Sequence, residues 1–345
     1  MSESAGRWVV IGVPSSAGAH HAGQDRAPAA LRAAGLIEAL RAAGESVRDA
    51  GDLPGAVFQA DHEHPRARNL AAVVRVAGEV ADAVAAVDDG ELPLVIGGDC
   101  TITLGVIAGF RRRHPDVGLV YVDGDADLGT GTDTGSGILD STGVAHLLGQ
   151  GTPELAGLAG APPLLEPSRL ALLGGDPRET DDAGRQFLAG LGVSFQEGPA
   201  LIADPAGAAR RAVDAVAAAS GPVVVHFDVD VVDSGDLPLS NFPHYGSRVL
   251  LEDAAAALRV LRRHPSFAGM VLTEVNPTYD ADGSQLQRYI SALVGVLAGP
   301  GLEAAVVQRA RYAASQRARP AGPGARGTFD EQYPGRDRQA WPRRP

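Results

Sequence analysis

The sequence predicts an α/β domain whose parallel sheet is covered by helices on both faces. Short apolar runs alternate with alanine-rich amphipathic stretches along most of the chain, and such runs are typical of buried parallel strands. The alternation of strands with helices favours one sheet with helices packed on both sides. No internal repeat or long linker interrupts the pattern, which predicts a single domain over residues 1–315.

Each element is expected where the local pattern changes. Apolar runs predict strands at residues 7–14, 92–98, 117–123, 169–175, 222–230 and 269–276. Helical spacing predicts helices at residues 27–42, 66–89, 101–113, 180–192, 205–219 and 250–264. Residues 316–345 are rich in Arg, Pro and Gly and lack apolar periodicity, which predicts a flexible tail or, alternatively, an arm that packs on a neighbouring subunit.

The composition excludes several classes of function. A formal charge of −12 over 345 residues gives no global support for binding nucleic acid or a membrane surface. No apolar run approaches the roughly 20 residues that span a bilayer, and the N-terminus lacks the pattern of a secretory signal, so a soluble cytoplasmic protein is expected. The chain contains no lysine, which excludes a Schiff-base lysine and a Walker-type phosphate loop.

Aspartates gather where two of the predicted strands end. Asp123, Asp125 and Asp127 occupy alternate positions after one apolar run, and Asp228 and Asp230 end another. Residues two apart share a face of a strand, and parallel sheets place functional groups at the carboxyl ends of their strands. Converging carboxylates repel one another unless a cation compensates them, so the pattern predicts a site for Mn²⁺, Mg²⁺ or Ca²⁺. Solvated loop acids or helix caps are the alternative.

Cys100, the single cysteine, lies at a third strand end, after Gly97, Gly98 and Asp99. A cysteine is commonly a small buried hydrophobic residue. Because this one follows a strand and adjoins the acidic cluster, a metal ligand is an equally good interpretation.

Four motifs resemble, in order, those of the ureohydrolases, the arginase and agmatinase superfamily, over roughly residues 7–312. LVIGGDC resembles GGDH, VDGDAD resembles DAHAD, HFDVD resembles SFDVD, and LTEVNP resembles the EVNP segment. The resemblance implies a three-layer α/β/α fold with a mostly parallel sheet of about eight strands. It also implies a trimer or hexamer, and two Mn²⁺ ions whose bridging hydroxide attacks the carbon of a guanidinium group.

The resemblance assigns metal ligands position by position. They are Cys100, Asp123, Asp125, Asp127, Asp228 and Asp230. The family's four aspartates are present, but Cys100 and Asp125 stand where it has histidines. Five carboxylates and one thiolate sum to −6, against −4 for four carboxylates and two neutral imidazoles, which weakens the metals as Lewis acids. A retuned two-metal site is expected; one metal, or Zn²⁺ or Fe²⁺ beside the thiolate, is the alternative.

The resemblance also assigns residues to the substrate. Glu274, in the EVNP segment, is implied to pair with the guanidinium, and Thr134 and Ser136 keep hydroxyls that hold the α-amino-acid end in arginases. Two asparagines of that loop are Gly129 and Ile138 in this sequence. Free L-arginine is therefore not the expected substrate.

Asp140 stands where the family has a proton-shuttling histidine. It is interpreted either as the proton carrier, although a solvated carboxylate has a much lower pKa than histidine, or as the N-cap of a helix through His146. His21 is expected at the rim of the site, in contact with substrate. His244 is interpreted as a plain loop residue, with substrate contact as the alternative, and His226 as a satisfied core histidine.

The leading hypothesis is a metal-dependent amidinohydrolase that releases urea, or a substituted urea, and an amine. Leu239, Ser240 and Asn241 replace a small Ala/Gly-Thr-Gly stretch of the family and, with Cys100, resemble relatives that act on modified guanidines such as N-hydroxyarginine in bacterial secondary metabolism. One alternative is a hydrolase of the same fold that acts on another linear amide or amidine bond. The other is a catalytically silent homologue that binds a ligand or a partner subunit.

Overall fold

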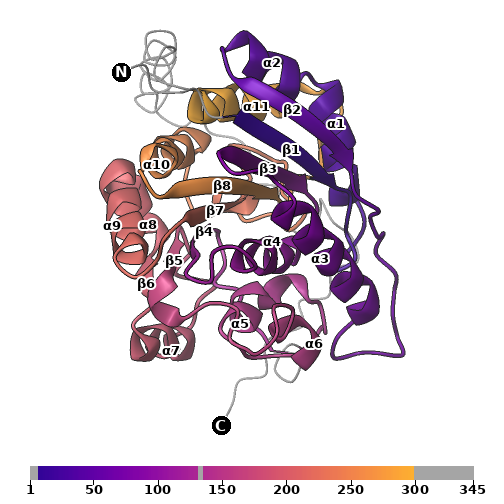
Figure 1. The fold of residues 1–345 in the computed structure, drawn as a ribbon, viewed down its shortest axis with the longest axis vertical. Helices are drawn as coiled ribbons and strands as arrows, with labels where there is room; N and C mark the ends of the chain where they lie inside the picture. The colour runs from indigo at the N-terminus through magenta and orange to yellow at the C-terminus, as the bar shows by residue number, and fades with distance from the viewer. Residues whose placement is uncertain (1–6, 131–134, 299–345) are drawn as a thin grey trace, which may run out of the picture. The chain divides into compact units, whose positions relative to one another are not determined.

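A parallel sheet runs through the centre of the computed structural model, which describes residues 7–130 and 135–298 (Figure 1). Its strand order is β2-β1-β3-β8-β7-β4-β5-β6, and each neighbouring pair is parallel. The strands are β1 (Arg7–Val13), β2 (Ser46–Asp52), β3 (Glu91–Gly97), β4 (Gly118–Val122), β5 (Leu170–Leu173), β6 (Ser194–Gln196), β7 (Val223–Asp228) and β8 (Phe267–Thr273). The predicted parallel sheet of about eight strands is confirmed.

Helices fill most of the connections between these strands. They are α1 (Ala27–Ala33), α2 (Leu36–Ala42), α3 (Leu70–Ala85), α4 (Ile102–Arg111), α5 (Gly143–Leu147), α6 (Pro153–Ala156), α7 (Asp182–Leu191), α8 (Gly198–Ala203), α9 (Pro205–Ala217), α10 (Leu251–Arg263) and α11 (Ser284–Leu297). A short 3₁₀ helix, η2 (Asp140–Thr142), precedes α5.

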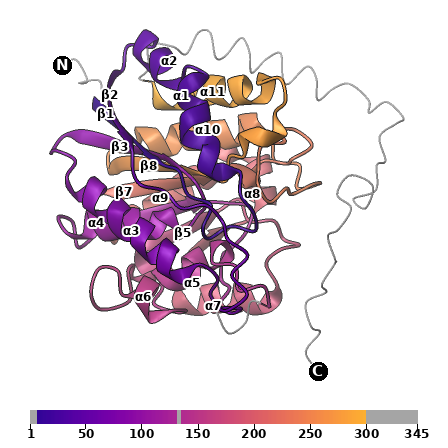
Figure 2. The same cartoon turned by 90° about the vertical axis from the view of Figure 1, so that its right-hand side faces the viewer.

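Alternate strand residues enter two separate hydrophobic cores, which creates the three layers. Trp8 and Val10 of β1 belong to a core shared with α1, α2, α9, α10 and α11. Val9 and Ile11 of the same strand belong to a second core, shared with α3, α4 and α5. The side-chain period of two along a strand produces this division. Figure 2 shows α10 and α11 on one side of the sheet and α3 and α4 on the other.

Several elements depart from the predicted pattern for local reasons. The edge strand β2 has the polar, largely exposed sequence SVRDAGD, which no apolar run reveals. The helix predicted at 27–42 is two helices because Gly35 between them has a φ of 88°, which glycine adopts without steric cost. The helix predicted at 66–89 begins only at Leu70, after Asn69 with a φ of 58°. The short edge strand β6 and the helix α11 were also not predicted.

The four central strands in the order β3-β8-β7-β4 determine where the site lies. Because they are parallel, their carboxyl ends meet at one edge of the sheet. Cys100 follows β3, Glu274 follows β8, Asp228 ends β7 and Asp123 follows β4. Residues separated by up to 174 positions therefore come together through topology alone.

Two further predictions concern the ends and the environment of the chain. The domain limit at residue 315 and the tail over residues 316–345 lie outside the described residues. None of the described helices is long and apolar enough to cross a membrane.

Candidate metal and substrate site

The loop after β3 places Cys100 at the edge of the sheet. A Cβ on Gly98 would lie 2.4 Å from the carbonyl oxygen of Ser15, so only glycine permits this close approach of the two loops. Asp99 is fully buried and its Oδ2 accepts hydrogen bonds from Ser15 Oγ and Gly18 N–H, both at 3.1 Å. Asp99 therefore holds the loop in place, and the adjacent Cys100 side chain enters the site.

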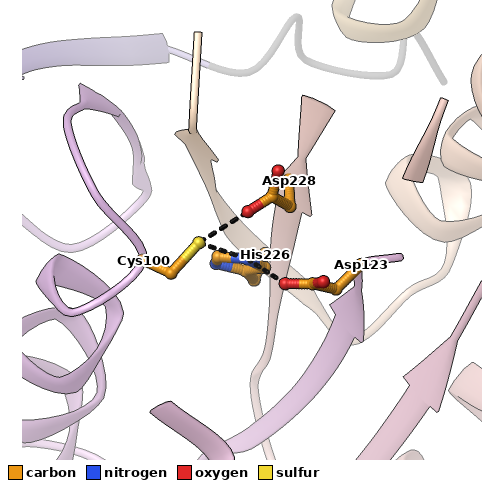
Figure 3. Close-up of side chains that lie close together, drawn as sticks. All are labelled: Cys100, Asp123, His226 and Asp228. Carbon is orange, nitrogen blue, oxygen red and sulfur yellow. Dashed lines mark hydrogen bonds and ion pairs between the residues drawn. The ribbon is translucent and has the colours of Figure 1, made fainter. Parts of the chain in front are cut away.

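A first group of potential metal ligands surrounds the Cys100 thiol. Cys100, Asp123, His226 and Asp228 are all buried, and one ligand atom from each lies within 4.8 Å of the others. The thiol donates to Asp228 Oδ2 at 2.6 Å, and Sγ lies 3.7 Å from His226 Nε2. Figure 3 shows these four side chains facing one another from three strand ends. The arrangement places a soft sulfur among carboxylates and an imidazole.

A second group lies beside the first and comprises Asp125, Asp230 and His244. His244 Nε2 lies 3.4 Å from Asp230 Oδ2 and 3.5 Å from Asp125 Oδ2. The backbone N–H groups of Asp125 and Asp230 donate to Asp123 Oδ1 and Asp228 Oδ1 at 2.6 and 2.7 Å. These two hydrogen bonds hold the residues of the second group next to those of the first.

Asp127 lies outside both groups. Its φ is 46°, its side chain is buried, and its Oδ2 accepts a hydrogen bond of 2.6 Å from Tyr121 Oη. The carboxylate has further lone pairs for a metal, so its assignment as a ligand stays a prediction.

Burial and mutual repulsion dominate the electrostatics of these carboxylates. Burial raises the pKa of Asp123, Asp127 and Asp228 well above the ordinary value, and neighbouring carboxylates raise it further. Burial also raises the pKa of the Cys100 thiol, and the negative charge of Asp228 is the next largest cause of that rise. In the described ranges, no arginine pairs with any of these groups. The carboxyl ends of the central strands therefore concentrate negative charge without a fixed arginine cation.

The histidine of the second group is the exception. Burial lowers the pKa of His244, but Asp125 and Asp230 outweigh that effect and raise it well above the ordinary value. His244 in turn lowers the pKa of Asp230 against the effect of burial.

Asp140 reaches the site from η2. Its Oδ1 accepts a 2.7 Å hydrogen bond from Cys100 N–H, ahead of α4. The N-cap of η2 is Leu139 and that of α5 is Thr142, and neither helix has a side-chain cap. The alternative of Asp140 as the N-cap of the helix through His146 is therefore wrong, because its carboxylate binds a different helix end.

Asp140 is also not the solvated carboxylate that the sequence suggested. Its carboxyl group lies among buried side chains, and burial, with the charge of Asp99 next in importance, raises its pKa to about 7. A group with this pKa gains and loses protons near neutral pH.

Glu274 lies beside Asp140 and Cys100, and the three form a third buried group within 4.8 Å. Its Oε1 accepts a hydrogen bond from Gln24 Nε2 at 2.6 Å, while its Oε2 is buried without a hydrogen-bond partner. Its φ is 63°, an unusual value for a non-glycine residue. Burial raises the pKa of Glu274 well above the ordinary value, and Asp140 raises it further.

The predicted substrate residues Ser136 and His21 do not belong to the three groups. Ser136 is exposed and its Oγ accepts from Ile138 N–H at 3.3 Å. His21 is half-buried, and its Nε2 lies 3.4 Å from Tyr279 Oη, close to the EVNP segment. Thr134 lies outside the described residues.

Sequence reasoning underestimated two histidines. His244 is only 5 % exposed and touches two predicted ligands, so its interpretation as a plain loop residue is wrong. His226 is fully buried, as expected of a core histidine, but its Nε2 also faces the first group. The position of His226 two residues before Asp228, on the same strand face, was an available signal. No spacing rule brings a loop residue such as His244 to this site.

Gln24 was also missed. It is the first residue of the 3₁₀ helix η1 (Gln24–Arg26), directly before α1, and its contact with Glu274 crosses 250 positions of sequence. Only the tertiary structure reveals that contact.

Comparison with known proteins agrees with this geometry. The Arginase family profile matches residues 7–298. The arginase of Bacillus caldovelox is 29% identical over 299 residues, which cover 85% of this chain and 98% of that protein. Arginase-1 of Homo sapiens is 28% identical over 295 residues, covering 83% and 90% of the two chains.

Solved structures give the same result. The native structure of the Bacillus caldovelox arginase superposes with a TM-score of 0.77 at 25% identity, covering 86% of this chain and 99% of that one. The proclavaminate amidino hydrolase of Streptomyces clavuligerus shares the fold, with a TM-score of 0.63 at 21% identity, covering 84% and 90%. Since the family profile spans most of the chain, the protein is a member of the arginase family of amidinohydrolases.

Proposed function

We propose that the protein is a metal-dependent hydrolase of a guanidino or amidino C–N bond, acting on a modified guanidine rather than free L-arginine. The products are urea, or a substituted urea, and an amine. The observation that carries the proposal is Glu274, whose Oε2 is buried without a hydrogen-bond partner beside a cluster of buried carboxylates. Such a group favours a cationic ligand with N–H donors, and a planar guanidinium offers both.

The donor set suits two divalent ions. Cys100, Asp123 and Asp228 would hold one ion, Asp125 and Asp230 the other, and Asp127 has lone pairs that could serve either. The buried His244 Nε2 makes no hydrogen bond and faces the carboxylates of the second set, as expected where a bound group completes the hydrogen bonding. Carboxylates favour Mn²⁺, whereas the thiol allows Zn²⁺ or Fe²⁺. Divalent ions, when bound, lower the pKa of water and so supply the nucleophile at neutral pH.

The residues of the chain orient the substrate and move protons around that chemistry. Glu274, fixed by Gln24, binds the guanidinium. Asp140, whose pKa lies at about 7, delivers a proton to the departing amine.

The preference for a modified guanidine rests on the surroundings of the site. Ile138, in the loop resembling the one that holds the α-amino-acid end in arginases, is 4 % exposed and apolar. Phe242 packs against His244 with ring centroids 5.4 Å apart, and it remains 37 % exposed. An apolar surface beside the second group favours a substituent less polar than free α-ammonium and α-carboxylate groups.

Steady-state assays test this function. Protein loaded with Mn²⁺ is assayed for release of urea or hydroxyurea from L-arginine, N-hydroxyarginine and other substituted guanidines. We expect kcat/KM to be at least about 10-fold higher for a substituted guanidine than for L-arginine. A higher value for L-arginine contradicts the substrate assignment.

The variant Glu274→Gln tests the role of the carboxylate. We expect kcat/KM to fall about 10²-fold, because a charge-assisted interaction with the cation is lost. Glu38→Gln, on the exposed side of α2, changes the same chemical group away from the site and should leave the rate unchanged.

Two outcomes would replace the proposal. Near-stoichiometric metal without turnover of any guanidine would favour a hydrolase of another linear amide or amidine bond. Metal content below about a tenth of an equivalent after Mn²⁺ loading, without turnover, would favour a catalytically silent homologue.

A further inference from the structure

Each of the first two groups of potential metal ligands contains an imidazole, although both histidines of the metal-binding motifs are absent. His226 belongs to the group with Cys100, and His244 belongs to the group with Asp125. Cys100 and Asp125 are the two residues that stand in the histidine positions of the motifs. Where Cys100 replaces a motif histidine, His226 thus brings an imidazole to the same group from another strand. Where Asp125 replaces the other motif histidine, His244 brings one from a loop.

His226 has the orientation of a metal ligand. Its ring stacks on Tyr121 with centroids 3.9 Å apart and an interplanar angle of 1°. Its Nδ1 lies 2.7 Å from Thr103 Oγ1, so the hydroxyl fixes one ring nitrogen and the other faces the group. Ligating histidines commonly have such a partner on the second nitrogen.

The distances around His226 suit a four-coordinate ion. Its Nε2 lies 3.7 Å from Cys100 Sγ and 3.7 Å from Asp123 Oδ2. Zinc bonds of about 2.0–2.3 Å at tetrahedral angles separate neighbouring ligand atoms by about 3.3–3.7 Å. The 2.6 Å contact between Cys100 Sγ and Asp228 Oδ2 is shorter than this separation, because the thiol donates a hydrogen bond to the carboxylate there. Loss of the thiol proton on metal binding removes that hydrogen bond.

His244 is fixed by its backbone rather than by ring stacking. Its N–H donates to Ser234 Oγ at 3.1 Å, and its carbonyl accepts from Ser234 N–H at 2.7 Å. The ring is buried, yet Nε2 makes no hydrogen bond. Its separations of 3.4 and 3.5 Å from Asp230 and Asp125 exceed ordinary N–H···O lengths. A buried nitrogen left between two carboxylates points to a group that fits among the three.

We propose that His226 and His244 are the imidazole ligands of the two metal ions. His226 completes the set of Cys100, Asp123 and Asp228, and His244 completes the set of Asp125 and Asp230. Each ion then has one imidazole nitrogen ligand, with His244 releasing its Nε2 proton to solvent when the ion binds, as the Cys100 thiol does. The Cys100 set, with sulfur and nitrogen, favours a softer ion than the oxygen-rich second set. This inference rests on the metal site of the proposed function and not on its substrate.

Pulsed electron paramagnetic resonance of the intact protein tests the ligation directly. Metal-free protein is loaded with Mn²⁺ to one and then two equivalents, with and without ¹⁵N-labelled histidine. We expect ¹⁴N modulation from coordinated imidazole that is replaced by ¹⁵N coupling in the labelled protein. Two bound equivalents without any histidine coupling overturn the proposal, and no substitution is needed to obtain that result.

Substitutions then identify which histidine serves which ion. We expect His226→Asn and His244→Asn each to weaken one of the two equivalents at least about 10-fold. His264→Asn is the matched control, since the ring of His264 contacts Asp214 at 3.6 Å and lies outside the three ligand groups. Binding of both ions with unchanged affinity in either variant overturns the assignment of that histidine.

A rival reading has His244 as an imidazolium that takes the place of the second ion. It predicts that the wild type binds one equivalent and that His244→Asn binds two, a result that would overturn the proposal. Because every readout is metal ligation, failure to hydrolyse guanidines leaves this test unaffected. Conversely, hydrolysis of guanidines without histidine coupling would contradict only the ligand assignment.

Discussion

Carboxylates occur in two contrasting surroundings in this molecule. At the β2 edge of the sheet, Arg32 of α1 donates two hydrogen bonds to Asp49, each of 2.9 Å, and Arg48 of β2 donates to Glu91 at 2.6 Å. These hydrogen bonds lower the pKa of Asp49 and of Glu91. The edge of the sheet thus carries its own cations.

At the carboxyl ends of β4 and β7 the same chemical group behaves in the opposite way. Burial and neighbouring carboxylates raise the pKa of Asp123 and Asp228, and no described arginine pairs with either of them. Burial alone does not explain the difference in pKa, since Glu91 is also buried. The two regions differ in that Glu91 has an arginine partner, whereas Asp123 and Asp228 have carboxylate neighbours. The centre of the molecule is therefore built to receive a cation, whereas the edge is complete without one.

The largest expected difference between the two regions is their response to divalent metal. Mn²⁺ at 100 times its dissociation constant should stabilise the folded protein by about 2.7 kcal/mol for each site, because it binds only the folded form. Thermal unfolding with EDTA and with added Mn²⁺ measures the shift. An unchanged midpoint at saturating Mn²⁺ would contradict the view that the central carboxylates receive a cation.

Asp228→Asn should weaken metal binding but stabilise the metal-free protein. We expect the affinity for Mn²⁺ to fall at least about 10-fold, since one of the proposed charged ligands is lost. The metal-free protein should become more stable by about 1 kcal/mol, because one buried charge no longer repels its neighbours. Calorimetric titration and urea unfolding in EDTA measure the two effects. A less stable metal-free variant would show that repulsion is not the dominant contribution of Asp228.

The two regions should also respond to pH with opposite sign. The folded-state pKa of Asp140 is about 7, above its ordinary value of 3.8, so the metal-free folded protein holds more protons between those limits. Its stability should therefore decrease as pH rises through about 4 to 7. For Asp49 and Glu91 the folded pKa is lowered, so their contribution is present above the ordinary pKa and is lost as pH falls below it.

Urea unfolding in EDTA at pH 5, 6, 7 and 8 measures this dependence. Asp140→Asn should flatten it, whereas Asp49→Asn should leave it unchanged over this range. A stability that increases steadily from pH 5 to pH 8 in the metal-free protein would show that the raised carboxyl pKa values do not control it.

The smallest effect is expected at the edge. Arg32→Gln removes the ion pairs with Asp49 and Asp52, both partly exposed, and should lower the free energy of unfolding by about 1 kcal/mol or less. The Mn²⁺ affinity should stay unchanged, because Arg32 is outside the three ligand groups. A loss of metal binding in this variant would mean that the edge and the centre are coupled.

The sequence by itself determined the fold class and most of the acidic centre. Buried parallel strands have to be apolar on both faces, and helices have to alternate with them, so local composition was sufficient for six of the eight strands. Asp123 and Asp228 were predictable in the same way, because a carboxylate at the end of an apolar run is a local feature. Such patterns can be recognised from neighbouring residues in the sequence alone.

The tertiary structure decided which polar groups meet. Glu274 contacts Gln24 across 250 residues, Asp140 binds the loop of Cys100, and His244 reaches Asp125 and Asp230 from a loop. None of these pairs has a fixed spacing, because loops of different length can bring different residues to the same point. The physical reason is that contacts between strand ends depend on sheet order and loop conformation, and neither is encoded in the neighbours along the chain.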